Sequence, residues 1–472
     1  MTAIVQPFID GQFQAGAAGF TTLNPYSKEV HAEVVDCDAA LVHAAVAAAH
    51  ERRKQAARVP GFERAAMLRR MAGSIRAHAT EIAAVMTAET GKPVSDSLME
   101  VERSAGTLEL SAEEAIRIAG EQIPLDSSAN GAHKIGLTLR VPVGVVAAIT
   151  PFNAPLNLCS HKIGPALAAG NTVVLKPAPQ ASATVHRYVQ ALAEAGIPPG
   201  WLNVIYGFSA GEALVNDLRV NFISFTGSTA IGERIKQGSG LRRAALELGG
   251  NGNTIVCHDA DVQQAARECA RNSMRLAGQS CISVQNVWVH EALVPSFKSV
   301  LINEVQAMRL GDPRDPATVV GPVISTAAAE RIEGLVAQAR RAGATVLHGD
   351  ARQGALYTPT VLMDTPLDCV AVTGEIFGPV VNILPFSSLN GVVEQINEGP
   401  FGLQAGVFTV SIRTAISLVR DLEMGGVIVN GTSTWRSDQA PYGGIKASGM
   451  GREGPKYAIR DMTEEKFVLF NI

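Results

Sequence analysis

Between Val145 and Leu248 the chain alternates short apolar runs with stretches of helical periodicity. A short apolar run followed by a helix and another short run is the pattern of a β-α-β unit, in which successive strands are parallel. We therefore expect a parallel sheet with helices on both faces and ligands at the carboxyl ends of its strands. The expected strands are Val145–Ile149, Thr172–Leu175, Leu202–Tyr206, Phe222–Phe225 and Ala244–Leu248, and the expected helices include Leu156–Ala169, Ala181–Ala195 and Thr229–Gln237.

The same alternation resumes near Gly250 and predicts a second α/β unit. A Gly-rich segment, Tyr442 to Gly454, is expected to be a loop. Expected helices of this unit are Asp261–Leu276, Ala327–Ala342, Leu389–Glu398 and Ile412–Met424, and expected strands are Val284–Val289, Val380–Leu384, Gly406–Thr409 and Val427–Asn430. Ahead of the first unit, helical spacing predicts one helix from Glu63 to Thr90 and another over Ser95–Ala119.

Two segments outside these units are predicted to form a β-ribbon. Residues 133–141 alternate apolar and polar side chains, and the apolar run Phe467–Phe470 lies near the end of the sequence. An exposed ribbon with an apolar face needs a partner surface. We therefore expect a homodimer or homotetramer.

Composition excludes several classes of function. The 472 residues are 47% apolar and 18% charged, with a net charge of −4 and no block of Lys or Arg, which argues against disorder and nucleic-acid binding. No Cys/His cluster has zinc spacing, so we expect no metal, and six cysteines in so long a chain favour a reducing compartment. No signal peptide or membrane-length apolar run is visible, so we expect a cytoplasmic protein without a membrane partner.

Cys281 is a candidate nucleophile. Free cysteines are most often buried and inert, but Gly278 and Ser280 leave room beside this one for a ligand to approach the sulfur. Glu247 ends an apolar strand, where a carboxylate is either edge-facing or a desolvated base of raised pKa. Asn153 follows the first strand of the β-α-β unit and is either a turn residue or an amide donor for an oxyanion.

Other residues suggest a cofactor, each with a plainer alternative. Lys176 ends the second strand and is either a solvated side chain or a ligand of ribose hydroxyls. Residues 225–232 join a strand to a helix, and free N–H groups at such a helix start favour a pyrophosphate. Their Gly spacing matches neither the dinucleotide fingerprint nor the Walker motif. His161 lies near Cys159, a pairing that more often reflects packing than a catalytic dyad.

Together these segments resemble the aldehyde dehydrogenase superfamily over nearly the whole chain. The matching segments are TPFNAPLN (150–157), GNTVVLKP (170–177), FTGSTAIG (225–232), LELGGN (246–251), GQSC (278–281), EIFGPV (375–380) and PYGGIKASGMGREG (441–454). The resemblance implies a dinucleotide-binding domain (1–121 and 143–249), a catalytic domain (250–454) and an oligomerisation ribbon (122–142 and 455–472). The end of the chain is similar to the lactaldehyde and phosphonoacetaldehyde dehydrogenase branch.

The resemblance also implies a role for each matched residue. Cys281 is the implied nucleophile, Glu247 the general base, and Asn153 an oxyanion donor together with the Cys281 backbone N–H. Lys162 and Glu453 match positions linked to proton relay or site polarity. The implied ligands of NAD, with NADP possible, are Thr150, Pro151, Phe152, Lys176, Gly227, Ser228, Leu248, Glu375 and Phe377. The implied activity is oxidation of an aldehyde to its acid through a Cys281 thioester.

Three departures from common family patterns bear on specificity. Pro179 stands where many NAD-preferring members carry a Glu that would repel a 2′-phosphate. Ser280 and Ala154 stand where phosphonate-handling members place Arg and His, which argues against a phosphonate substrate. Arg103 and Arg436 remain possible anion ligands, so carboxylate-bearing and neutral aldehydes both stay open.

Two other functions compete with hydrolytic aldehyde oxidation. A CoA-acylating dehydrogenase would pass the thioester to CoA, but such members generally lack the Glu that Glu247 matches. A catalytically silent binding protein on the same fold would be expected to have lost the nucleophile that Cys281 matches.

Overall fold

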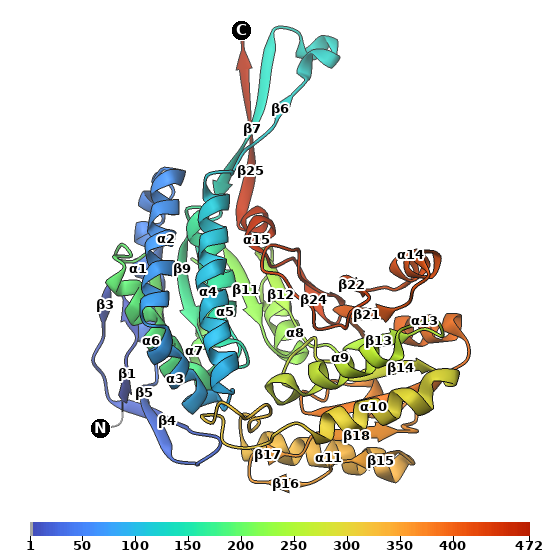
Figure 1. Ribbon diagram of the computed structural model, residues 1–472. Helices are drawn as coiled ribbons and strands as arrows, with labels where there is room; N and C mark the ends of the chain where they lie inside the picture. The colour runs from blue at the N-terminus through green and yellow to red at the C-terminus, as the bar shows by residue number, and fades with distance from the viewer. Residues whose placement is uncertain (1–2) are drawn as a thin grey trace.

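The computed structural model describes residues 3–472 as two α/β units and a projecting β-arm (Figure 1). The first unit is built on an eight-stranded sheet whose central strands are parallel. In spatial order its strands are β24 (Gly449–Met450), β12 (Arg243–Glu247), β11 (Phe222–Thr226), β8 (Val145–Ile149), β9 (Thr172–Lys176), β10 (Leu202–Val204), β2 (Phe8–Ile9) and β3 (Gln12–Phe13). A small sheet, β1 (Ala3–Val5), β5 (Val30–Val35) and β4 (Ala18–Leu23), lies near the N-terminus.

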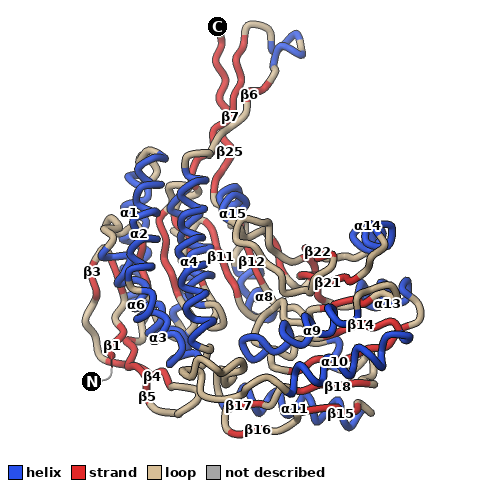
Figure 2. Tube along the Cα trace, viewed as in Figure 1, coloured by secondary structure: helices blue, strands red, loops and turns tan. Residues whose placement is uncertain are grey.

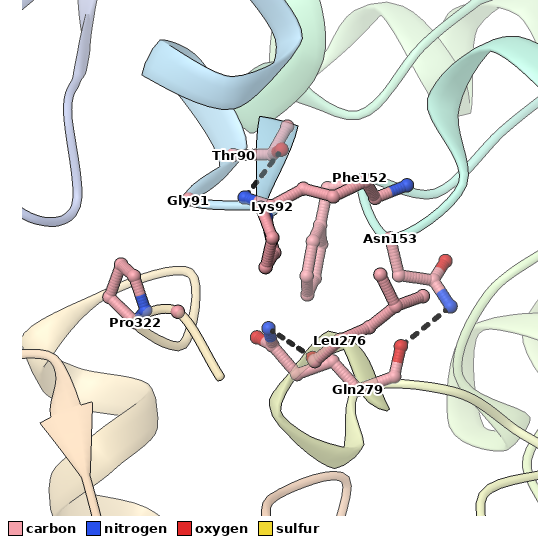
Figure 3. Close-up of a pocket in the computed structure, with 10 residues that line it drawn as sticks. Thr90, Gly91, Lys92, Phe152, Asn153, Leu276, Gln279 and Pro322 are labelled. Carbon is pink, nitrogen blue, oxygen red and sulfur yellow. Dashed lines mark hydrogen bonds between the residues drawn. The ribbon is translucent and has the colours of Figure 1, made fainter. Parts of the chain in front are cut away.

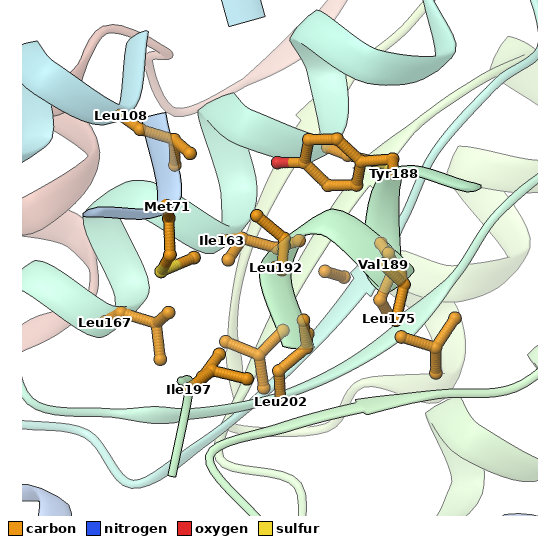
Figure 4. Packing of buried hydrophobic residues seen from close by; sticks show 14 of the residues in the cluster. Met71, Leu108, Ile163, Leu167, Leu175, Tyr188, Val189, Leu192, Ile197 and Leu202 are labelled. Carbon is orange, nitrogen blue, oxygen red and sulfur yellow. The ribbon is translucent and has the colours of Figure 1, made fainter. Parts of the chain in front are cut away.

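Helices cover both faces of the first sheet because its central strands are apolar on both faces. In β8, Val146 and Ala148 belong to one hydrophobic cluster, whereas Val145 and Ala147 belong to another. The first cluster includes side chains of α2 (Gly61–Ala77), α3 (Ala79–Thr90), α4 (Val94–Ala115), α5 (Pro155–Ala168) and α6 (Ser182–Glu194), part of which Figure 4 shows. The second includes side chains of α1 (Ala39–Ala56), α7 (Ala210–Asn216) and α8 (Thr229–Gly238).

Every residue of α5 is buried, because the helix lies between the sheet and α4. This placement holds the N-terminal end of α5 directly after β8, at the carboxyl edge of the parallel strands. Polar residues at that end are therefore fixed by packing on several sides.

The second unit is a seven-stranded sheet flanked by helices. Its strands are β15 (Thr345–His348), β18 (Thr360–Met363), β19 (Val380–Phe386), β14 (Asn286–His290), β13 (Asn253–Val256), β21 (Gln404–Phe408) and β22 (Gly426–Val429). All neighbours except β15 and β18 pair in parallel. The flanking helices are α9 (Val262–Met274), α10 (Val294–Gln306), α11 (Thr326–Ala342), α12 (Val370–Thr373), α13 (Leu389–Glu398) and α14 (Ile412–Asp421).

The predicted ribbon is present and projects from the body (Figure 2). Strand β25 (Thr463–Asn471) pairs antiparallel with β7 (Lys134–Pro142), and β6 (Gln122–Ile123) pairs with the other edge of β7. Two short pairs complete the strands: β16 (Arg352–Gln353) with β17 (Leu356–Tyr357), and β20 (Phe401–Gly402) with β23 (Ile445–Lys446). The α/β class predicted from the sequence, with two units and a ribbon, is thus confirmed.

Two local predictions are wrong. The helix expected from Glu63 to Thr90 breaks at His78, where the backbone leaves helical geometry and the ring contacts Glu194 at 2.7 Å. No Gly or Pro marks that break, so periodicity alone could not reveal it.

The segment from Tyr442 to Gly454 is not wholly a loop, because β23 and β24 lie within it. Strand β24 pairs with β12 at the edge of the first sheet, where Gly449 has a φ of +125°. A Cβ on Gly449 would lie 1.9 Å from the Leu246 carbonyl oxygen, so only glycine allows this approach. The short α15 (Pro455–Asp461) packs on α5 and not along the ribbon, and the domain boundaries themselves stay a prediction.

Candidate active site

Cys281 follows a strained turn that places it on the wall of a cavity. Leu276 and Ala277 have left-handed backbone conformations, with φ of 55° and 52°. At Gly278 a Cβ would lie 1.9 Å from the Gly378 carbonyl oxygen, so the turn packs directly on the segment after Glu375. The other five cysteines are buried, whereas Cys281 is partly exposed. Cys281 is therefore the cysteine with access to a ligand.

The cavity has a volume of about 880 Å³. Its walls come from α4, the start of α5, α9, the Cys281 turn and the segment 427–436. Four cationic side chains line it: Lys92, Arg103, Arg275 and Arg436. It is large enough for a small-molecule substrate to reach the Cys281 sulfur.

Asn153 lies beside Cys281 on the same cavity wall, as its position between β8 and α5 requires. Its side-chain Nδ2 donates a hydrogen bond to the Gln279 carbonyl oxygen at 2.9 Å (Figure 3). An amide nitrogen carries two hydrogens, so one remains free to donate. Phe152 leads into this turn and packs edge-to-face on Phe377, with ring centroids 6.0 Å apart.

The environment of the Cys281 thiol disfavours the thiolate. Burial, and to a lesser extent the nearby Glu375 and Glu247, raise the pKa of Cys281 to about 12. A hydrogen bond with the Tyr442 hydroxyl, at 3.0 Å, and the charge of Arg436 act in the opposite direction. The thiol thus keeps its proton near neutral pH unless a bound ligand or a base changes that balance.

Glu247 is buried at the end of β12, and within residues 3–472 neither of its carboxylate oxygens has a hydrogen-bond partner. Burial, and then the charge of Glu453, raise the pKa of Glu247 well above its ordinary value. A desolvated carboxyl group of raised pKa is suited to act as a base near neutral pH. Gly443 lies against it, since a Cβ there would be 2.8 Å from Glu247 Oε1.

Lys162 and Glu453 meet in a buried ion pair. Lys162 Nζ lies 3.2 Å from Glu453 Oε1, and Arg436 Nη2 lies 2.7 Å from Glu453 Oε2. Burial raises the pKa of Glu453, but Lys162 and Arg436 outweigh it and hold that pKa below its ordinary value. Glu453 is therefore charged, and its charge helps keep the Glu247 carboxyl group protonated.

Most residues expected to bind the cofactor lie along the carboxyl edge of the first sheet, whereas Glu375 and Phe377 belong to the second unit. Lys176 is buried at the end of β9, where burial lowers its pKa to about 8 and its Nζ donates to the Pro177 carbonyl. Thr150 directly follows β8, and its hydroxyl contacts the buried Cys159 sulfur at 3.4 Å. Pro151 follows it and is partly buried.

Further groups that could bind a ligand lie near the carboxyl ends of β11 and β12. Gly227 and Ser228 precede α8, whose first turn has no side-chain cap, and a Cβ on Gly232 would clash with Leu248. Burial raises the pKa of Glu375 to about 7, and its Oε1 accepts from the Gly250 N–H at 3.1 Å. An uncapped helix start, an ammonium group and a carboxylate fit the pyrophosphate and ribose hydroxyls of a dinucleotide.

Four contacts at or next to the cavity were not predicted. Asp438 accepts hydrogen bonds from Arg103 Nη2 at 2.6 Å and from Asn157 Nδ2 at 3.1 Å, and lies 3.0 Å from His161 Nε2. His161 therefore pairs with Asp438. Tyr442 contacts Cys281 across a separation of 161 residues. In the sequence, this contact was indicated only by the presence of Tyr442 within the matched motif at 441–454.

Comparison with known proteins agrees with this geometry. Residues 13–468 match the sequence pattern described as the aldehyde dehydrogenase family. The chain belongs to the aldehyde dehydrogenase family. It is 42% identical to the 3-sulfolactaldehyde dehydrogenase of Priestia megaterium, over 98% of each chain, and 37% identical to the lactaldehyde dehydrogenase of Methanococcus vannielii, over 98% of this chain and 99% of that protein.

A solved structure extends the match to three dimensions. The NADP-dependent glyceraldehyde-3-phosphate dehydrogenase of Bacillus halodurans C-125, complexed with NADP, superposes with a TM-score of 0.96 at 33% identity, over 100% of this chain and 99% of that chain. The resemblance found in the sequence is thus confirmed. This aldehyde dehydrogenase is an NAD(P)-dependent enzyme that oxidises an aldehyde.

Residues 3–472 contain neither a candidate membrane span nor a candidate metal site. In that part of the chain, no helix is long and apolar enough to cross a membrane. Within the same residues, no group of three His, Cys, Asp or Glu side chains is placed to hold a metal ion.

Proposed function

We propose that Cys281 is the nucleophile of this aldehyde dehydrogenase and that the enzyme releases its product by hydrolysis. The observation that carries the proposal is the partly exposed Cys281 on a cavity wall, with the Asn153 amide on the same wall and a Glu247 carboxyl group near it that has no hydrogen-bond partner within residues 3–472. A nucleophile, an oxyanion donor and a base are the groups that acyl transfer requires.

The roles follow from the atoms that remain free. The Cys281 thiolate adds to the aldehyde carbon, and the resulting oxyanion accepts hydrogen bonds from the second Nδ2 hydrogen of Asn153 and from the Cys281 backbone N–H. One such donor typically contributes about 3–4 kcal/mol to transition-state stability. Once Cys281 carries a thioester, Glu247 accepts a proton from the water that hydrolyses it. Lys162 and Glu453 set the polarity around Glu247.

A nicotinamide cofactor supplies the hydride acceptor when it is bound. Lys176 and Glu375 would hold its ribose hydroxyls, Phe377 would support the nicotinamide, and Gly227 and Ser228 would lie at the pyrophosphate. Thr150, Pro151, Phe152 and Leu248 would complete its site. We propose NAD as the cofactor with NADP also accepted, because Pro179 contributes no carboxylate to repel a 2′-phosphate and the compared glyceraldehyde-3-phosphate dehydrogenase holds NADP.

We further propose that the aldehyde carries an anionic group such as a carboxylate or a sulfonate. Arg103 has one nitrogen, Nη1, that makes no hydrogen bond in the described chain, and Arg436 Nε is likewise buried without a partner. Planar guanidinium groups with free donors suit an oxyanion. The similar Priestia protein is named for a sulfonated aldehyde, which agrees with this class.

A substrate panel tests the proposed function. We expect NAD(P)H formation, without added CoA, from short aldehydes bearing a sulfonate or carboxylate. The kcat/KM for these should exceed that of neutral aldehydes of equal length by about 10-fold or more, as expected for a hydrogen bond to a charged group. Absorbance of reduced cofactor, followed with NAD and NADP separately, measures this. A strict requirement for CoA would contradict hydrolysis, and equal kcat/KM values would contradict the anionic substrate class.

Replacing Glu247 by Gln separates the two halves of the reaction. We expect a pre-steady-state burst of reduced cofactor to survive and the following turnover to slow by about 100- to 10,000-fold, because only the second half needs the base. Because the pKa of Glu247 is raised, the fraction of ionised Glu247 increases as pH rises. Hydrolysis should therefore accelerate with pH in the native enzyme and lose this pH dependence in Glu247→Gln. Rapid-mixing absorbance at several pH values measures both.

Glu268→Gln is the matched control, since Glu268 also lines the cavity but lies on α9. This control variant should retain native turnover. Near-native steady-state turnover of Glu247→Gln would remove Glu247 from the hydrolytic step.

We also propose a homodimer or homotetramer assembled through the ribbon. Strand β25 forms an edge of its sheet, with apolar side chains on both faces. Phe467 is 54% exposed and Leu469 42% exposed. A lone edge with this much exposed apolar surface is stabilised by adding to a neighbouring sheet.

Sedimentation velocity at micromolar concentration should show at least a dimer. The double variant Phe467→Glu, Leu469→Glu should shift the protein toward monomer, because two charges would have to be buried in the proposed ribbon interface. Leu241→Glu is the control, because Leu241 is fully exposed outside the ribbon. This variant should leave the assembly unchanged. A native protein that sediments as a monomer contradicts this proposal.

A further inference from the structure

We propose that Tyr442 is a catalytic residue whose hydroxyl donates a hydrogen bond to Cys281 Sγ and stabilises the thiolate before attack. The inference deepens the proposed function and rests on Cys281 being the nucleophile. It assigns a role to an aromatic side chain in the segment 441–454 that the mechanism above leaves unused.

The first support is the contact itself. The Tyr442 hydroxyl oxygen lies 3.0 Å from Cys281 Sγ, and within residues 3–472 this is its only hydrogen-bond partner. Tyr442 is 5% exposed, so water does not compete freely for the hydroxyl. Most buried phenol hydroxyls in proteins have a hydrogen-bond partner, and for Tyr442 that partner is the reacting sulfur.

The direction of the bond follows from the protonation states. Burial and the neighbouring Cys281 raise the pKa of Tyr442 well above its ordinary value, so the phenol keeps its proton. A thiolate has no proton to donate. Once Cys281 is ionised, the only hydrogen bond between the two groups runs from the Tyr442 O–H to the sulfur.

The second support is that the ring is held in place from three directions. Arg436 Cζ lies 4.0 Å from the ring centroid, a cation–π geometry. The Tyr442 N–H donates to the Glu453 carbonyl at 3.1 Å, and the Glu453 N–H donates to the Tyr442 carbonyl at 2.7 Å. Ile282, next to Cys281, and Leu403, between β20 and β21, form one buried hydrophobic cluster with Tyr442.

The charges around the sulfur explain why such a donor is needed. Burial, Glu375 and Glu247 all disfavour the thiolate, whereas Tyr442 and Arg436 favour it. Arg436 is already shared with Glu453, which leaves Tyr442 as the group that contacts the sulfur directly. A hydrogen bond to the charged form lowers the pKa of the group that accepts it.

The chemical step balances without a change in Tyr442. The thiol releases its proton to water, and the thiolate electron pair forms the C–S bond while the carbonyl π pair moves to oxygen. The phenol keeps its own proton throughout. Because the sulfur loses its charge on attack, the hydrogen bond acts mainly by raising the fraction of thiolate in the enzyme that awaits substrate.

Tyr442→Phe tests the proposal, because it removes the hydroxyl and keeps the ring beneath Arg436. The thiolate of Cys281 is followed by its ultraviolet absorbance, taken as the difference from the matching Cys281→Ala protein, and by alkylation with iodoacetamide. We expect the pKa of the Cys281 thiol to rise by about one to two units in Tyr442→Phe. At a fixed pH below that pKa, alkylation should therefore be about 10- to 100-fold slower than in the native protein. The burst of reduced cofactor should slow by a similar factor and recover as pH rises.

Tyr206→Phe is the matched control, since its buried hydroxyl has no hydrogen-bond partner. It should leave the Cys281 titration unchanged. An unshifted titration in Tyr442→Phe overturns the proposal even if turnover falls, because a purely structural effect would change rates without moving the thiol pKa. Failure of the proposed function is recognised separately, by turnover that persists in Cys281→Ala.

Discussion

The active site depends on one buried carboxylate held between two cations. Glu453 lies between Lys162, which is 1% exposed, and Arg436, whose side chain is 13% exposed. Removing Glu453 would leave two buried cations without their shared counter-charge, and loss of one partner from a buried ion pair typically costs about 3–5 kcal/mol. The Lys162–Glu453 pair joins α5 to the segment 441–454. The same segment carries Tyr442, which contacts Cys281.

This charge network sets the protonation of its neighbours. A negative charge at Glu453 opposes a second one at Glu247, which is buried beside it without a hydrogen-bond partner. Arg436 extends from Glu453 across the Tyr442 ring, whose hydroxyl contacts Cys281. The proposed base, the proposed nucleophile and the proposed donor to that nucleophile are therefore coupled through Glu453, although their positions in the sequence are far apart.

The sequence predicted those features that have a local cause. Strand β8 and helix α13 have the bounds expected from their apolar patterns, and the alternation in residues 133–141 predicted a ribbon strand. The shared role of Cys281 and Asn153 at one oxyanion was implied by the family resemblance of their motifs and not by a local pattern. The pairings of Asp438 with His161 and of Tyr442 with Cys281 bridge 277 and 161 residues, and no local pattern encodes them.

Whether Cys281 carries the reaction is tested most directly by Cys281→Ala, assayed for NAD(P)H formation and for cofactor binding in the same preparation. The account predicts no detectable aldehyde oxidation together with native cofactor affinity, because the sulfur is removed while Lys176, Glu375 and the start of α8 stay in place. Cys159, buried in α5 with its pKa raised to about 12 by burial, should not substitute for it. Retained turnover in Cys281→Ala would contradict the account.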